Sequence, residues 1–156
     1  MNKLKTIYRD AQDLVRNEKN ARATVYRWRD EFQREFAVKM DWCVKEYDEA
    51  NHPPIVSVNG FSKKEPLSMK VKPGKKVELN ASESSDPDGD SLSCEWMIYP
   101  EAGNLTKPVQ IEADSAYASL IAPKLNPGSS LHIILRVSDD GSPRLTSYKR
   151  IIIQNR

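Results

Sequence analysis

Three aspartates at alternate positions are the side chains of this sequence whose type and spacing best suit ion binding. Asp86, Asp88 and Asp90 stand in the run DPDGD at residues 86–90. Crowded carboxylates repel one another, and Ca²⁺, which takes about six to eight oxygen ligands, relieves that repulsion. The intervening Pro87 and Gly89 are turn residues, however, and aspartates in turns bond their own backbone. We therefore favour a turn with solvated aspartates and keep a calcium site as the alternative.

Two further aspartates, Asp139 and Asp140, follow a predicted strand near the end of the chain. In an immunoglobulin-like sandwich the loops at residues 83–91 and 139–145 would lie at the same end of the domain. Five carboxylates would then meet there. The run at 86–90 lacks the glycine and the distal glutamate of a helix-loop-helix calcium site. Apart from this calcium alternative, the sequence predicts no cofactor and no other metal.

The elements that position these aspartates are predicted strands, because apolar and polar residues alternate on both sides of the acidic run. Trp96 falls on the apolar face of the following strand, and we expect it to point into the core. The alternation predicts strands at 55–58, 67–71, 76–81, 92–99, 109–113, 116–121, 131–138 and 146–153. The fold class is therefore mainly β, with an immunoglobulin-like β-sandwich at residues 53–156.

A helical lead-in is predicted for residues 1–52, which makes the chain α+β overall. It comprises a short helix at 6–16 and a long amphipathic helix at about 24–50, which the prolines at 53 and 54 end. The long helix carries an aromatic stripe with Trp28, Phe32 and Phe36, and Trp42 lies at its edge. We expect partial burial of this stripe on the sandwich, with these four residues also packing against a neighbouring domain that is absent from this chain.

Catalysis by this chain alone is not expected. A nucleophile triad needs a histidine base, and His52 stands in a proline linker while His132 lies on a strand, facing outward or to a sheet edge. No phosphate-binding loop or zinc motif is present. Tyr99, Tyr117 and Tyr148 lie at or near strand ends and are the candidates for contact with a sugar, although buried rings with hydroxyls at the rim are the interpretation we favour.

The charge balance indicates neither a nucleic acid nor a membrane as partner. The net charge of +2 over 156 residues is close to neutral. No apolar run approaches the ~20 residues that a membrane span requires, and no signal peptide opens the chain. Met1 followed directly by charged helical sequence indicates the cut end of a longer protein.

Several motifs together resemble one bacterial family. They are the segments at 24–33, 36–43, 51–54, 85–92, 99–103 and 131–135. They are similar to the C-terminal region of bacterial proteins with a nucleoside hydrolase-like domain, a family also described as cellulose-binding, whose tail is immunoglobulin-like. The resemblance covers about residues 6–156. The helix motif at 24–43 is specific, whereas the acidic loop alone is shared by many sandwich modules.

This resemblance implies a parent protein with an N-terminal hydrolase-like domain as the partner of this chain. It implies export to the periplasm or the outside, and a non-catalytic accessory role that orients the catalytic domain. Binding of a cellulose-like glycan is the alternative function. The aspartates that bind calcium and ribose in nucleoside hydrolases would belong to the missing domain, so no catalytic residue is carried over to this chain.

Overall fold

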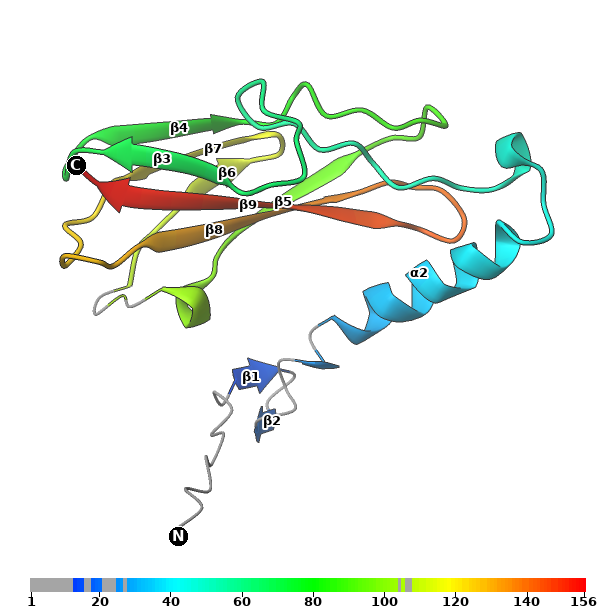
Figure 1. The fold of residues 1–156 in the computed structure, drawn as a ribbon, viewed down its shortest axis with the longest axis horizontal. Coiled ribbons are helices and arrows are strands. Elements are labelled where there is room, and N and C mark those ends of the chain that lie inside the picture. The colour runs from blue at the N-terminus through cyan, green and yellow to red at the C-terminus, as the bar shows by residue number, and fades with distance from the viewer. Residues whose placement is uncertain (1–12, 16–17, 21–24, 27, 104, 106–107) are drawn as a thin grey trace, which may run out of the picture.

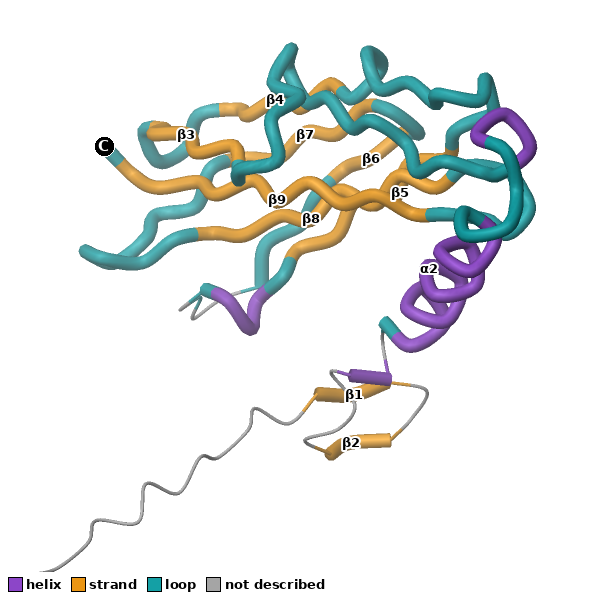
Figure 2. The backbone as a smooth tube through the Cα atoms, turned by 45° about the vertical axis from the view of Figure 1, so that its right-hand side comes forward, coloured by secondary structure: helices purple, strands orange, loops and turns teal. Residues whose placement is uncertain are grey.

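The computed structural model describes residues 13–15, 18–20, 25–26, 28–103, 105 and 108–156. Its body is mainly β, with two sheets lying over one another and the helix α2 (Arg29–Asp41) beside them, as Figure 1 shows. The C-terminus lies at one end of the sheets, and the chain leaves α2 at the other end. Figure 2 shows the same arrangement after a turn of the molecule.

The larger sheet has four strands in the order β3-β9-β8-β5. These strands are β3 (Leu67–Val71), β9 (Thr146–Asn155), β8 (Leu131–Ser138) and β5 (Ser93–Ile98). The pairs β8–β9 and β5–β8 are antiparallel, whereas β3 runs parallel to β9. The central strand β8 begins and ends at the predicted residues.

The smaller sheet has three antiparallel strands in the order β4-β7-β6. They are β4 (Lys76–Asn80), β7 (Tyr117–Ile121) and β6 (Glu112–Asp114). Its inward positions alternate with exposed ones along β4 and β7, which is the pattern of a sheet with one face on the core.

The hydrophobic core lies between the two sheets. Leu79 and Leu120 enter it from the smaller sheet, and Ile133, Leu135 and Ile151 enter it from the larger one. Trp96 is 8% exposed, as predicted, and its indole Nε1 donates a hydrogen bond of 3.0 Å to the carbonyl of Ser115. The ring is therefore buried with its polar atom satisfied.

Two of the predicted strands differ in the structure. The segment 55–58 forms two isolated bridges, Ile55 with Ser85 and Val58 with Phe61, instead of a strand. Ile55 exchanges both backbone hydrogen bonds with Ser85, so the segment pairs with the acidic loop and not with a sheet. The strand predicted at 109–113 is the shorter β6, which begins three residues later and ends one residue later.

The helical lead-in is where the sequence-based prediction is wrong. The long helix expected at about 24–50 is the 13-residue α2, followed by the short 3₁₀ helix η1 (Tyr47–Glu49). The indole Nε1 of Trp42 donates to the carbonyl of Asn51 at 2.9 Å. This bond joins the helix end to a residue nine positions later, so the chain must turn back after Asp41.

The short helix expected at 6–16 lies mostly outside the described residues. Its described end, β1 (Asp13–Val15), is a strand that pairs antiparallel with β2 (Glu18–Asn20). The helix prediction is therefore wrong for residues 13–15, where a local hairpin pairing replaces it.

Candidate functional site

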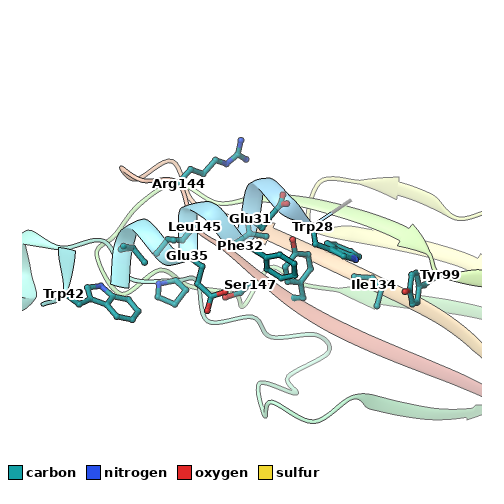
Figure 3. Close-up of a pocket in the computed structure, with 14 residues that line it drawn as sticks. Trp28, Glu31, Phe32, Glu35, Trp42, Tyr99, Ile134, Arg144, Leu145 and Ser147 are labelled. Atoms are coloured by element: carbon teal, nitrogen blue, oxygen red, sulfur yellow. The ribbon is translucent and has the colours of Figure 1, made fainter. Parts of the chain in front are cut away.

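A groove runs between α2 and the outer face of the larger sheet, with a volume of about 570 Å³. The helix contributes Trp28, Phe32 and Val38, and the sheet contributes Ile134 and Tyr148. Figure 3 shows Trp42 and Tyr99 at opposite ends of this groove, with Phe32 between them. The lining is chiefly apolar and aromatic, which is typical of a surface that binds another molecule.

The helix touches the sheet through Trp28 of the predicted stripe and through two residues outside the stripe, Glu31 and Val38. Trp28 meets Tyr148 edge to face, with ring centroids 5.2 Å apart and planes at 88°. Glu31 Oε1 accepts a 2.6 Å hydrogen bond from Arg136 Nη2 on β8. Val38 is fully buried. These contacts recur at helical spacing, so one side of α2 is anchored to the sheet.

Most of the predicted stripe is exposed. The exposed fractions are 55% for Phe32 and 66% for Phe36, and Met40, one helical turn further along, is 50% exposed. Partial burial on the sandwich therefore holds for Trp28 and Phe32, which line the groove, and is least for Phe36. Of the four predicted packing residues, Trp28, Phe32 and Trp42 line the groove, whereas Phe36 does not. The reason is that the helix is rotated so that Glu31 faces the sheet, where Arg136 pairs with it.

Tyr148 is held in its neutral form. Burial, followed by the negative charge of Glu31, raises the pKa of Tyr148 to about 12. Its phenol therefore keeps its proton at physiological pH and offers a hydroxyl beside the ring of Trp28.

The three tyrosines proposed for sugar contact do not form one surface. Tyr99 and Tyr148 line the groove, whereas Tyr117 lies on β7 in the smaller sheet and is 56% exposed. The edge-to-face contact of Trp28 with Tyr148 also means that these two rings are not coplanar.

The acidic residues form a second candidate site at the end of the sheets where α2 ends. Carboxylate oxygens of Asp86, Asp88 and Asp90 all lie within 4.8 Å of one another. Asp86 Oδ1 accepts from the backbone N–H groups of Asp88, at 2.8 Å, and Asp90, at 3.3 Å, as expected for an aspartate turn. The loop is therefore an aspartate turn whose three carboxylates are also close enough together to hold one ion.

Asp139 and Asp140 lie at the same end of the molecule. Asp139 is 1% exposed, and its Oδ1 accepts from the backbone N–H of Leu145 at 2.8 Å. Asp140 Oδ1 accepts from the backbone N–H of Ser91 at 2.8 Å, which ties the two loops together. Burial raises the pKa of Asp90, and the charges of Asp86, Asp140, Asp139 and Asp88 raise it further. Four carboxylates of this end therefore act electrostatically on Asp90.

Sequence reasoning missed the contribution of residues 51 and 52 to this site. Asn51 is 7% exposed, and its Nδ2 donates to Asp139 Oδ2 at 3.2 Å and to the carbonyl of Pro143 at 2.9 Å. His52 donates its backbone N–H to Asp88 Oδ2 at 2.6 Å, and its Nδ1 lies 2.9 Å from Asp88 Oδ1. The available signal was a polar pair directly before two prolines that fix the chain direction.

His132 lies on the outer face of the larger sheet, as the alternation along β8 predicts, yet it is only 4% exposed. Its Nε2 lies 2.7 Å from Ser130 Oγ, and Arg150 Nε donates to its Nδ1 at 2.9 Å. Since Arg only donates, the neutral ring carries its proton on Nε2 and donates to Ser130. The ring therefore does not accept the serine proton, as a catalytic base would have to.

Comparison with known families gives a match over residues 76–155 to the family described as "Cellulose-binding protein Sde0182, C-terminal domain". The chain belongs to this family. A solved structure of a nucleoside hydrolase-related hypothetical protein from Saccharophagus degradans, described as associated with carbohydrate metabolism, has 36% sequence identity and a TM-score of 0.80. The match covers 85% of this chain and 33% of that one, so the chain spans about a third of the length of that structure.

Other comparisons add less. The match to human CDH23 EC21-23, at 16% identity, covers 67% of this chain and 35% of that one. Its TM-score of 0.42 carries no argument. A search of the curated proteins finds no match. Within the described residues, no helix has the length and apolar character needed to cross a membrane.

Proposed function

We propose that this chain is a non-catalytic accessory domain that orients the hydrolase-like domain of a longer, exported protein. The family supports this, because it is a C-terminal domain of a cellulose-binding protein. The solved relative supports it as well, since two thirds of that nucleoside hydrolase-related protein lie outside the match. The strand order of the two sheets further supports an immunoglobulin-like sandwich, a common accessory module.

The observation that carries the proposal is the two-sided character of α2. One side is anchored to the sheet by Trp28, Glu31 and Val38. The adjoining face leaves Phe32, Phe36 and Met40 at least half exposed, with Phe32 at the edge of the groove. Large apolar side chains gathered on one exposed face are typical of a protein–protein contact. The occupant we propose is the hydrolase-like domain of the same parent chain.

The proposal also implies that this chain alone does not hydrolyse nucleosides. The Ser130–His132 pair is oriented with the ring donating its proton, which does not generate a nucleophile. Incubation of the purified chain with nucleosides should therefore release no free base, and turnover that is lost in a Ser130→Ala variant would contradict this part of the proposal.

The docking role is tested by introducing a negative charge into the exposed face of α2 in the full-length parent protein. Phe36→Asp should accelerate proteolysis between the two domains about tenfold or more, because burial of one large apolar side chain contributes about 1.5–3 kcal/mol. The isolated chain should keep its unfolding midpoint, since the side chain is 66% exposed here. Ile121→Asp on β7, where the side chain is 58% exposed, is the matched control and should leave proteolysis unchanged. Equal rates for Phe36→Asp and the unmodified parent would refute the docking role.

Binding of a cellulose-like glycan is the second candidate, favoured by the aromatic lining of the groove. Sugar rings stack on aromatic faces, and Trp28, Tyr99 and Tyr148 line this groove. If this candidate is right, the chain should sediment with insoluble cellulose, and Trp28→Ala should reduce the bound fraction, with Tyr117→Ala on the opposite sheet as the control. A chain that stays in the supernatant supports the orienting role alone.

A further inference from the structure

We propose that the acidic end of the sandwich binds one Ca²⁺ ion, held by Asp86, Asp88 and Asp90 together with the amide oxygen of Asn51. The ion would join the loop before β5 to the segment that leaves α2. It would therefore act as a joint that fixes the helix-bearing segment relative to the two sheets.

The spacing of the carboxylates fits a single hard cation. Oxygens of Asp86, Asp88 and Asp90 lie within 4.8 Å of one another. Ca²⁺ binds oxygen at about 2.3–2.6 Å, so ligands on opposite sides of the ion are about 5 Å apart. One ion placed among these three side chains would reach all of them.

Asn51 supplies an observation that is independent of the acidic loop. Its side chain is more than nine-tenths buried, and its Nδ2 donates to Asp139 Oδ2 and to the carbonyl of Pro143. These two acceptors fix which atom of the amide is the oxygen. That oxygen, Oδ1, has no hydrogen-bond partner among the residues that the structure describes. A buried oxygen left without a partner is costly, and a cation would satisfy it.

The amide of Asn51 lies against the same point of the chain as the carboxylate of Asp90. A Cβ atom built on Gly141 would be 2.4 Å from Asn51 Nδ2, 2.6 Å from Asn51 Cγ and 2.4 Å from Asp90 Oδ2. The missing side chain of Gly141 is thus what lets the two groups approach each other. Asp86 Oδ2 is a second buried oxygen for which the described residues offer no partner. A cation bound at this acidic end would satisfy both oxygens.

The donor set favours calcium over other metals. The candidate ligands are all oxygens, which suit hard cations, and Mg²⁺ would demand a near-ideal octahedron. Asp139 is a positioning residue, because it is only 1% exposed and its two oxygens accept from Asn51, Gly141 and Leu145. Asp140 ties the neighbouring loop through Ser91 and lies at the rim of the site.

The site reaches the segment after α2 through His52. The His52 backbone donates to Asp88, and its ring stacks on Tyr47 with centroids 3.9 Å apart and on Trp42 at 5.9 Å. An ion that orders Asp88 would therefore also order the turn between Trp42 and His52.

Thermal unfolding of the chelator-treated chain tests the site. Calcium at about 100 times its dissociation constant should raise the midpoint by about 5–10 °C, and calorimetric titration with CaCl₂ should give one site per chain. Magnesium at the same concentration should raise the midpoint by less than half of that shift. No heat and no shift with calcium would overturn the proposal.

Two variants separate metal binding from misfolding. Asp90→Asn should raise the midpoint in chelator, because it removes one of several repelling charges, and should abolish the calcium-dependent shift. Asp114→Asn, an exposed aspartate on β6 in the smaller sheet, is the matched control and should keep the full shift. A full calcium shift in Asp90→Asn would overturn the assignment of the ligands.

The joint is tested by tryptic cleavage at Lys45, which lies between α2 and Asn51. Calcium should slow this cleavage at least about threefold in the unmodified chain and leave it unchanged in Asp90→Asn. If calcium binds but does not slow cleavage at Lys45, the proposal that the ion fixes the segment after α2 is wrong.

Discussion

His132 illustrates at the scale of single residues how an outward-facing strand position can become buried. Its neighbours Leu131 and Ile133 are fully buried, so the alternation along β8 alone places His132 on the outer face. The segment after β5 covers it: a Cβ atom on Gly103 would lie only 3.5 Å from the ring. The ring is held by Ser130 on one side and Arg150 on the other.

This burial predicts acid sensitivity of folding. Burial, and then the positive charge of Arg150, lowers the pKa of His132 below its ordinary value of 6.5. Below pH 6.5 His132 therefore binds a proton more readily in the unfolded chain than in the folded one. Its contribution to the free energy of unfolding is fully present above pH 6.5 and is lost as the pH falls towards the lowered pKa. The slope is at most about 1.4 kcal/mol per pH unit for one group.

The measurement is denaturant unfolding between pH 5 and pH 7.5. His132→Gln keeps a side-chain acceptor for Arg150 but does not titrate, so its stability should depend less on pH than that of the unmodified chain. Identical pH profiles for the two proteins would show that His132 does not carry this effect.

At the scale of elements, the strands were predictable and the contact face of α2 was not. Alternation of apolar and polar residues locates β4, β5, β8 and β9 to within about two residues, because a strand with one buried face must alternate. Helical spacing, by contrast, identified the aromatic stripe but not the side that packs. Glu31 has the sequence character of a solvent-facing residue, and only its partner Arg136, 105 residues away, makes it a buried contact.

The ion pair of Glu31 with Arg136 is expected to hold α2 on the sheet. Glu31 is the less exposed partner, with 15% of its side chain accessible, and Arg136 also reaches Glu95 at 3.2 Å. Glu31→Gln should weaken docking of the helix by about 1–2 kcal/mol, since the amide oxygen still accepts from Arg136 but the charge that strengthens this partly buried hydrogen bond is removed. Hydrogen exchange should then become faster in α2 and stay unchanged in β8.

Glu35→Gln on the same helix is the matched control for this change. Glu35 pairs with Lys39 at 2.8 Å, but both side chains are more than half exposed, so the loss should be below about 0.5 kcal/mol. If the two variants accelerated exchange in α2 equally, the anchoring role of Arg136 would be wrong.

At the scale of the whole molecule, contacts at the acidic end determine the residue at which the sandwich domain begins. The sequence predicts a boundary at residue 53, from the two prolines. The structure buries Ala50 and Asn51, at 4% and 7% exposure, and Asn51 is hydrogen-bonded to the loop that follows β8. Only the folded chain reveals this, because the partners of Asn51 lie 88 and 92 positions away.

Fragments that differ by three residues test where the independently folding unit begins. A fragment of residues 50–156 keeps Asn51 and its bonds to Asp139 and Pro143, whereas a fragment of 53–156 leaves Asp139 Oδ2 buried without that donor. An unsatisfied buried group costs about 1–3 kcal/mol, so 53–156 should be less stable by that amount in denaturant unfolding. Asn51→Ala in the longer fragment should reproduce most of the loss, which ties it to this side chain. Equal stability of the two fragments would return the boundary to residue 53 and would show that residues 50–52 belong to the lead-in.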